Sequence, residues 1–358
     1  MRKVGVGVVG CGNIAPIYLQ NLSSFDETAV VAVADIKPER AKARAEEFGV
    51  KKATDLKGLL DDPDVEVVLN LTTPPSHFSV AKAALEAGRH VYNEKPLTID
   101  VREADELLAT SSDRGLLVGC APDTFLGAGI QTCRELIDHG AIGEPLAFNA
   151  FMMCPGHEGW HPDPAFYYDF GGGPLFDMGP YYLTALVALL GPVARVCGAK
   201  KKSFETRTIG SEPKRGEQID VKVPTHLVTV MEFAGGAVGQ LTTSFDVKHH
   251  TLPHIEVYGS KGTLGVPDPN GFDGKVRLRS AGDDDWKEVP LARPYAQNSR
   301  GLGVRDLVQA AEEGREPRAS GALARHVLQV IHATHAAPHR GEYVEIEGVE
   351  RPEAMPSD

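Results

Sequence analysis

The sequence predicts an α/β protein with a doubly wound parallel sheet in its N-terminal part and an α+β domain with a large, mostly antiparallel open sheet in its C-terminal part. Two observations predict this fold. Residues 3–122 alternate short apolar segments with helical ones, which is typical of a parallel sheet covered on both faces. After residue 122, strand-like segments are joined by glycine-rich turns, as in an antiparallel sheet. We therefore expect a first domain over residues 1–121 and a second over 122–358.

The expected elements follow from apolar spacing. In the first part, expected strands are residues 3–10, 29–35, 65–72, 90–96 and 116–122, and expected helices are 38–49, 55–62, 77–88 and 101–115. In the second part, a helix at 127–140 precedes strands within 145–154, 226–247, 254–266, 275–280 and 286–291. Two helices follow at 299–314 and 322–337, and the tail after Val349 is expected to fray.

Composition excludes several classes of protein. The formal net charge of −12 over 358 residues argues against nucleic acid or an anionic membrane as the main partner. No apolar segment reaches the roughly 18 residues that a membrane span needs, and glycines interrupt the apolar N-terminal segment. We therefore expect a cytoplasmic protein. The five cysteines are scattered without C-x-x-C spacing, which predicts neither a disulfide framework nor a zinc site.

A G-x-G-x-x-A motif follows the first expected strand and opens a helix, with Gly10, Gly12 and Ala15 at its fixed positions. In that context the motif is the Rossmann dinucleotide fingerprint, because the glycines allow a tight turn and a close approach of pyrophosphate to the helix N-terminus. We expect Gly10, Gly12 and the loop residues Asn13 and Ile14 to contact the cofactor.

Asp35 ends the next expected strand, 20 residues after Ala15. A carboxylate there accepts hydrogen bonds from ribose hydroxyls and repels a 2′-phosphate, so it favours NAD over NADP. Lys37 weakens this preference, because its ammonium suits a phosphate. The alternative role for Asp35 is to cap the following helix.

Polar residues also follow the strand expected at 65–72. Thr72, Thr73 and Pro74 lie at its carboxyl end, the edge where doubly wound sheets bind ligands. We expect these three residues and His77 to contact the cofactor, with capping or packing as the alternative for His77.

Glu94 and Lys95 end the strand expected at 90–96, on the same edge, and Pro96 follows them. A lysine presented beside a nicotinamide can orient a substrate hydroxyl and stabilise a developing alkoxide. The alternative is a surface lysine paired with Glu94.

With these motifs and the segment GGGPLFDMGPYYL at 171–183, the chain resembles the Gfo/Idh/MocA oxidoreductase family over nearly its whole length. The resemblance implies an NAD(P)-binding N-terminal domain and a C-terminal domain whose open sheet mediates oligomerisation, so a homodimer or homotetramer. It also implies sugar, inositol or related polyol substrates. The family's catalytic lysine falls on Lys95.

The D-x-x-x-H motif of that family falls on Asp177 and Tyr181, so tyrosine stands in place of the histidine. Some branches of the family also carry tyrosine there as the proton-transfer residue. The i, i+4 spacing is expected to place Asp177 and Tyr181 on one helix face. Tyr182 is expected to pack in the core.

The segment 152–170 precedes these glycines and is rich in aromatic and polar residues, which suits a sugar ring. We expect His157, Trp160 and His161 to contact the substrate. His157 and His161 flank Glu158, and two histidines at this spacing can share a metal ion if they lie on a helix. Proline and glycine in the segment argue against a helix, so no metal is expected. His249, His250 and His254 are expected to lie in solvent or at an interface.

The sequence therefore predicts an NAD-dependent oxidoreductase that transfers hydride between the nicotinamide and a carbinol or keto carbon of a sugar or polyol. Lys95 and Tyr181 would assist proton transfer, and Asp177 would orient the substrate. The alternative is an NAD-dependent glycoside hydrolase that oxidises the sugar transiently, eliminates the aglycone and returns the hydride. Because Lys95 and Asp177 are both present, a non-catalytic NAD-binding regulator is the least favoured interpretation.

Overall fold

The computed structural model describes residues 2–356 and divides the chain into two compact units. The first unit contains the residues up to Gly127 and Gln297–Leu328, and the second contains Ala128–Ala296 and the residues from Gln329 onward. This division differs from the boundary expected after residue 121, because the segment from Gln297 returns to the first unit. Within residues 2–356, no helix is long and apolar enough to cross a membrane.

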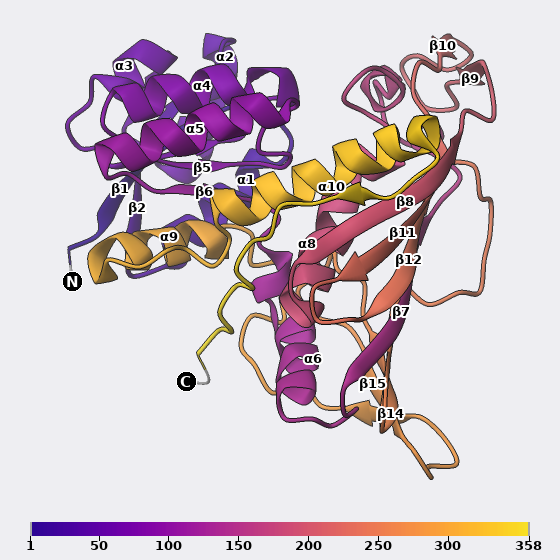
Figure 1. Cartoon of the computed structure of the whole chain (residues 1–358). Helices are drawn as coiled ribbons and strands as arrows, with labels where there is room; N and C mark the ends of the chain where they lie inside the picture. Colours follow the sequence, from indigo (N-terminus) through magenta and orange to yellow (C-terminus); the bar gives the residue numbers. More distant parts are fainter. Residues whose placement is uncertain (1, 357–358) are drawn as a thin grey trace. The chain divides into compact units, whose positions relative to one another are not determined.

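The first unit is built on a six-stranded parallel sheet in the order β3-β2-β1-β4-β5-β6, the doubly wound arrangement (Figure 1). The predicted parallel sheet is confirmed. Its strands are β1 (Val4–Val9), β2 (Thr28–Ala34), β3 (Lys52–Thr54), β4 (Val67–Asn70), β5 (His90–Asn93) and β6 (Val118–Cys120). The sequence analysis missed β3, because this three-residue edge strand carries no apolar run.

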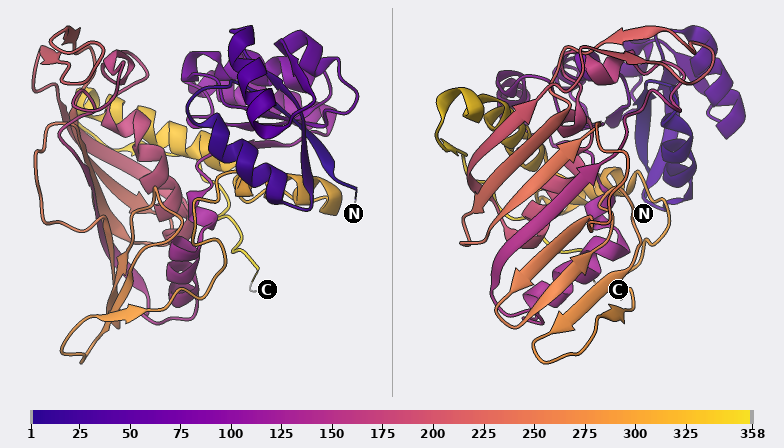
Figure 2. Two further views of the ribbon diagram at one scale, coloured as in Figure 1. Left: turned by 180° about the vertical axis from the view of Figure 1, so that it is seen from behind. Right: turned by 90° about the vertical axis from the view of Figure 1, so that its right-hand side faces the viewer.

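The helices of this unit are α1 (Ala15–Ser24), α2 (Pro38–Phe48), α3 (Leu56–Leu60), α4 (Pro74–Glu86), α5 (Val101–Arg114) and α9 (Leu302–Glu313), with a 3-10 turn η1 (Thr124–Leu126). α9 lies beside α1, where Asn21 donates to the carbonyls of Asn298 and Arg300 (Figures 1 and 2). The buried Asp123 carboxylate accepts from the backbone N–H groups of Gly301 and Gly303 at the start of α9, and burial raises its pKa to about 6. Asp123 therefore ties the returning segment to the first unit.

The second unit is built on a nine-stranded sheet in the order β16-β15-β14-β13-β7-β12-β11-β8-β17. The strands are β7 (Pro145–Met153), β8 (Val193–Lys201), β11 (His226–Phe233), β12 (Val238–Ser244), β13 (Ile255–Gly259), β14 (Gly262–Val266), β15 (Val276–Ser280), β16 (Lys287–Val289) and β17 (Val344–Glu345). A separate pair is formed by β9 (Thr206–Thr208) and β10 (Gln218–Asp220). All neighbouring strands of the large sheet are antiparallel except β7 and β12, so the mostly antiparallel open sheet is confirmed.

Helices of the second unit cover one face of this sheet, and they lie behind it in the right-hand view of Figure 2. They are α6 (Ala128–Asp138), α7 (Pro174–Asp177), α8 (Gly179–Leu190) and the C-terminal half of α10 (Gly321–Arg340), with a 3-10 turn η2 (Ala165–Tyr168). Every residue of α8 up to Leu189 is buried, which explains why its sequence is apolar on all sides. α8 is the central helix under the sheet.

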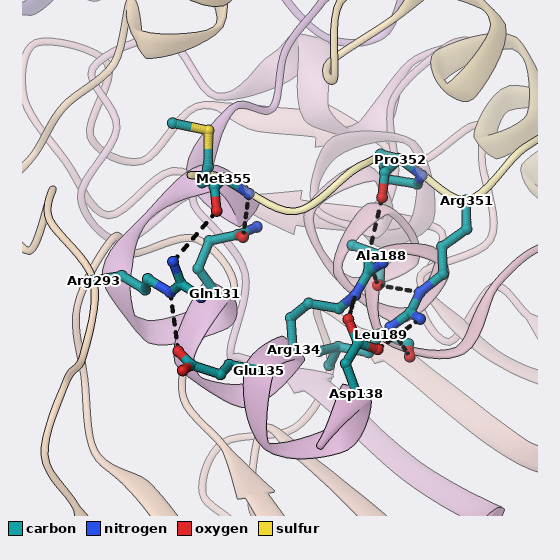
Figure 3. A network of polar contacts seen from close by, with 10 residues as sticks. All are labelled: Gln131, Arg134, Glu135, Asp138, Ala188, Leu189, Arg293, Arg351, Pro352 and Met355. Carbon is teal, nitrogen blue, oxygen red and sulfur yellow. Dashed lines mark hydrogen bonds and ion pairs between the residues drawn. The ribbon is translucent and has the colours of Figure 1, made fainter. Parts of the chain in front are cut away.

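The C-terminal tail is docked onto the second unit, so the prediction that it frays after Val349 is wrong (Figure 3). Arg351 donates to the carbonyls of Ala188 and Leu189 at the end of α8 and pairs with Asp138 of α6. Farther along, the N–H of Met355 donates to Gln131 Oε1 at 2.8 Å. The last carbonyls of a helix lack partners within the helix, and here an arginine of the tail supplies donors for two of them.

Candidate active site

The glycine loop after β1 has the geometry that the fingerprint requires. Gly10 has φ +100°, and a Cβ on it would lie 2.6 Å from the carbonyl carbon of Leu71, so only glycine fits between the ends of β1 and β4. A Cβ on Gly12 would meet no described atom within 4 Å. The space over Gly12, at the N-terminus of α1, is therefore open, which suits the approach of a pyrophosphate.

Asp35 holds the glycine loop and the start of α2 together. Its Oδ2 accepts from the N–H of Cys11 at 2.7 Å, and its Oδ1 accepts from the N–H of Lys37 at 2.8 Å. The contact with Lys37 precedes the first turn of α2, which has no side-chain cap, and the Asp35 side chain remains half-exposed at the carboxyl end of β2. Next to it, the side chain of Ile36 is 96% exposed, an apolar surface that the sequence analysis did not single out.

A buried amide pair joins the carboxyl ends of β4 and β5. Asn70 Nδ2 donates to Asn93 Oδ1 at 3.0 Å, and Asn93 Nδ2 donates to the carbonyl of Leu97. Asn70 Oδ1 accepts from both the N–H and the hydroxyl of Thr72. Both asparagines are fully buried, so their amides are fixed. The sequence analysis missed this pair, although each is a polar residue that ends an apolar strand.

His77 is fully buried on α4 and lies between two loop carbonyls. Its Nδ1 is 2.6 Å from the carbonyl oxygen of Pro96, and its Nε2 is 3.0 Å from that of Thr72. Burial lowers the pKa of His77 and outweighs the opposing effect of the two carbonyls. This geometry matches the packing alternative, because the ring joins the Lys95 loop to the Thr72 loop.

Glu94 fixes the backbone of Lys95. Glu94 Oε1 accepts from the hydroxyl of the buried Tyr18 on α1 at 2.7 Å, and Oε2 accepts from the N–H of Lys95 at 2.9 Å. The Lys95–Pro96 peptide bond is cis. Glu94 therefore supports the lysine through its main chain, and it also links the Lys95 loop to the helix that follows the glycine loop.

The glycine-rich segment of the second unit forms two helices rather than one. α7 ends at Asp177, Met178 lies between the helices, and α8 begins at Gly179, so the helix expected through Asp177 and Tyr181 is interrupted at Met178. A Cβ on Gly172 would lie 2.5 Å from the carbonyl oxygen of Phe166. The glycine thus allows a close approach to the chain's own backbone. Tyr181 is 8% exposed.

His157 contacts Asp177. Its Nε2 is 3.4 Å from Asp177 Oδ2. Its ring contacts Tyr167, with centroids 4.2 Å apart, and Trp160, with centroids 5.4 Å apart. The structure therefore brings His157 to Asp177 and Trp160 to His157, and Trp160 is 62% exposed.

His161 belongs to the same aromatic cluster, with its ring centroid 5.3 Å from that of Trp160. Its Nδ1 accepts from the N–H of Asp163 at 3.0 Å, and burial lowers the pKa of His161. The Nδ1 of His161 is therefore occupied by a donor from its own loop.

A buried ion cluster lies behind the aromatic residues. The Arg207 guanidinium pairs with Glu158 at 2.6 Å and with Asp246, and Glu158 also accepts from the Tyr168 hydroxyl. The Glu158 carboxylate therefore serves to hold Arg207 and Tyr168 in place. Within the part of the chain that the structure describes, no group of three or more His, Cys, Asp or Glu residues could hold a metal ion.

Tyr182, the neighbour of Tyr181, packs in the core as expected and is 2% exposed. Its hydroxyl lies 3.0 Å from Nδ1 of His254, and burial raises the pKa of Tyr182. His254 is exposed, as are His249 and His250, and it also contacts this tyrosine.

Comparison with protein families matches both units. Residues 4–121 match an oxidoreductase family with an NAD-binding Rossmann fold, and residues 130–265 match the GFO/IDH/MocA C-terminal domain. A relative from Streptomyces violaceoruber, a dTDP-3,4-didehydro-2,6-dideoxy-alpha-D-glucose 3-reductase, is 34% identical over 77% of this chain and 81% of its own length. The chain belongs to the Gfo/Idh/MocA oxidoreductase family. It is an NAD(P)-dependent oxidoreductase with an N-terminal NAD-binding Rossmann domain.

Other members and solved structures agree with this assignment. A myo-inositol 2-dehydrogenase from Thermotoga maritima is 25% identical over 72% of this chain and 74% of its own length. A levoglucosan dehydrogenase, solved in complex with NADH and L-sorbose, is 22% identical with a TM-score of 0.84 and covers 98% of this chain and 100% of its own. An NAD-binding oxidoreductase from Klebsiella pneumoniae is 21% identical, also with a TM-score of 0.84, over 97% of this chain and 100% of its own. The two structures show the same fold.

Proposed function

We propose that this protein is an NAD-dependent dehydrogenase or reductase that acts on a carbinol or keto carbon of a sugar, inositol or related polyol. The observation that carries the proposal is the position of Lys95, at the carboxyl end of β5 in the same sheet whose first loop carries the dinucleotide fingerprint. Ligands of doubly wound sheets bind at that edge. The family relatives named for inositol and sugar substrates support the substrate class.

The cofactor contacts follow from the first unit. The N-terminus of α1 and the open space over Gly12 suit the pyrophosphate. Asp35 keeps a half-exposed carboxylate for the ribose hydroxyls, and its charge favours NAD over NADP. The exposed Ile36 beside it offers an apolar face for the adenine ring. The remaining proposed cofactor contacts are Asn13, Ile14, Thr72, Thr73, Pro74 and Glu94. His77 contacts the loop of Thr72 from α4 and so helps to hold it in place.

Proton transfer is assigned to Tyr181, with assistance from Lys95. When bound, the nicotinamide accepts or returns the hydride. Removal of hydride from a carbinol also requires a group that takes the hydroxyl proton. We assign that role to the Tyr181 phenol, with the Lys95 ammonium stabilising the negative charge that develops on oxygen. Asp177 orients a neighbouring substrate hydroxyl by accepting its hydrogen bond.

The substrate contacts proposed for the second unit come from the aromatic cluster around His157. Trp160 presents an exposed ring and His161 lies against it. A sugar ring has apolar C–H faces that suit such rings and hydroxyls that suit the polar groups beside them. His157, Trp160 and His161 are therefore proposed to select a ring-shaped polyol.

The open sheet is proposed as the surface that forms a homodimer or homotetramer. Its uncovered face carries a row of paired residues, Phe151, Thr242 and Val228, on three adjacent strands, and Phe151 and Val228 are half-buried. The apolar side chains of Phe151 and Val228 on this open sheet are suited to burial against a second copy. Light scattering coupled to gel filtration is expected to give a mass of two or four chains. The cytoplasmic location stays a prediction.

The test is a screen of NAD⁺ reduction over sugars, inositols and aryl glycosides, with release of the aryl group followed in parallel. The proposal predicts NADH accumulation with at least one sugar or inositol. Release of the aryl group without NADH accumulation would instead support the glycoside hydrolase alternative. The cofactor preference is tested by repeating the screen with NADP⁺ and by comparing wild type with Asp35→Asn. Loss of the carboxylate should reduce the ratio of kcat/KM for NAD⁺ to kcat/KM for NADP⁺.

A further inference from the structure

His157 contacts Asp177 from a different segment of the chain. It lies in the loop after β7, 20 residues before Asp177, and its Nε2 is 3.4 Å from Asp177 Oδ2. Both side chains are largely buried, with 12% and 18% of their surfaces exposed. Nε2 itself is buried and makes no hydrogen bond to any residue that the structure describes.

Such a nitrogen is unfavourable in a folded protein, because a buried polar atom without a partner loses its bond to water and gains nothing in return. Buried polar atoms of this kind are uncommon. The carboxylate of Asp177 is the acceptor that Nε2 faces, and the two atoms are close to hydrogen-bond distance. Hydrogen bonds of active sites are often long before ligands bind and shorten in the complex.

The ring of His157 has little freedom to turn away. It contacts Tyr167 at 4.2 Å between centroids, with 47° between the ring planes, and it contacts Phe245 at 4.6 Å, with 68° between the planes. The next residue, Glu158, is held by Arg207 and Tyr168. The packing of the ring and the contacts of Glu158 therefore keep Nε2 near Asp177.

We propose that His157 is a positioning residue for Asp177, whose Nε2–H donates to Oδ2 of the carboxylate. This bond holds the carboxylate in one orientation, in which it can accept a hydrogen bond from a substrate hydroxyl, a consequence that rests on the proposed function. The pairing itself is a property of the second unit alone.

The pairing is tested without any substrate by histidine-selective ¹⁵N NMR on the full chain, with the His157 signals assigned from their loss in His157→Phe. The expected result is a protonated Nε2 whose resonance moves in Asp177→Ala. Asp163→Ala is the matched control, because Asp163 is an acid of the same segment that pairs with the exposed Lys214. An unprotonated Nε2, or a resonance that Asp177→Ala does not move, would overturn the proposal.

Two variants then separate hydrogen bonding from packing in turnover. His157→Phe keeps the ring against Tyr167 and Phe245 but removes the donor, whereas His157→Gln loses the ring but carries an N–H that can reach the position of Nε2. With the sugar that the wild type oxidises fastest, His157→Phe should lower kcat/KM about ten- to a hundredfold, as expected for a lost hydrogen bond to a charged group. The kcat/KM of His157→Gln should be at least threefold higher than that of His157→Phe.

In the Asp177→Ala background, His157→Phe should have no further effect on kcat/KM. The proposal would be overturned if His157→Phe had the same kcat/KM as wild type. It would also be overturned if His157→Gln had a lower kcat/KM than His157→Phe. If the wild type oxidises no sugar, the proposed function fails, and the NMR experiment still decides whether His157 and Asp177 pair.

Discussion

Lys95 is held through its neighbours on both sides in the chain. The Glu94 carboxylate accepts from the Tyr18 hydroxyl and from the N–H of Lys95, and the carbonyl of Pro96 faces the ring of His77. These contacts fix the main chain on both sides of Lys95. A lysine fixed in this way is suited to stabilising charge at one point, because little reorganisation is needed during the reaction.

Replacing Lys95 should therefore abolish turnover without removing the cofactor site. Lys95→Ala is expected to lower kcat by about a hundredfold or more, since it deletes the cation assigned to the developing alkoxide. NAD affinity, measured by fluorescence titration, should stay within about tenfold of wild type, because the glycine loop and Asp35 are untouched. Lys95→Arg is the control that keeps the charge. A Lys95→Ala enzyme with wild-type kcat would exclude the lysine from the chemistry.

Tyr181 and Tyr182 offer a matched pair for the proton-transfer assignment. Tyr181→Phe should lower kcat by about a hundredfold or more, because general base catalysis contributes that much when the base is in place. Tyr182→Phe removes only the hydroxyl that meets His254, so it should lower the melting temperature slightly and leave kcat near wild type. Steady-state kinetics and thermal denaturation on both variants check this. Similar kinetics for the two variants would contradict the assignment.

The residues proposed to carry chemistry were easier to single out from the sequence than the residues that hold them. Gly10, Lys95 and Asp177 stand in short motifs, so local sequence is enough to propose them. Tyr18, by contrast, meets Glu94 from 76 positions away. Single polar residues inside apolar segments give no sign of a distant partner, and the sequence analysis missed this contact for that reason.

At the scale of elements, β4 and β5 are joined at their carboxyl ends by buried polar contacts. Asn70 and Asn93 bind each other, and His77 of α4 lies between the carbonyls of Thr72 and Pro96. These contacts connect the loop expected to meet the cofactor with the loop that carries Lys95. A change at His77 should therefore affect both loops.

His77→Phe is expected to destabilise the protein by about 2 kcal/mol or more, because it leaves a buried carbonyl without a donor. His77→Asn keeps an N–H near the position of Nδ1 and should recover part of the loss, together with part of the NAD affinity. Thermal denaturation with and without NAD measures both effects. Ser79→Ala, an exposed change on the same helix, is the control. If His77→Phe kept wild-type stability and NAD affinity, the connecting role of His77 would be excluded.

Element types were predicted more reliably than their ends and contacts. The helices α9 and α10 lie where the spacing of apolar residues predicts them. The break between α7 and α8 at Met178 was not predicted, because the spacing of Asp177 and Tyr181 fits one helix equally well. β8 was also missed, since VARVCGAKK mixes basic and small residues with few apolar ones.

For the whole molecule, the order of segments along the chain does not show which of them form one compact unit. The segment from Gln297 to Leu328 completes the first unit, although it follows nearly the whole of the second. The tail binds α6 and the end of α8 through Arg351 and Met355. Both facts depend on contacts between residues far apart in sequence, which spacing and composition do not encode. The strand–helix alternation, a local signal, predicted the parallel sheet correctly.

The proposed function requires that a hydride move between NAD and a carbinol carbon. The most direct measurement is a single turnover with NAD⁺ and a sugar or inositol from the screen that carries deuterium on the reacting carbon, followed by mass spectrometry of the cofactor. We expect one deuterium in the reduced cofactor for each molecule of ketone formed, with a slower rate than for the unlabelled substrate. A cofactor that stays oxidised and unlabelled while a glycoside is cleaved would contradict the proposed function.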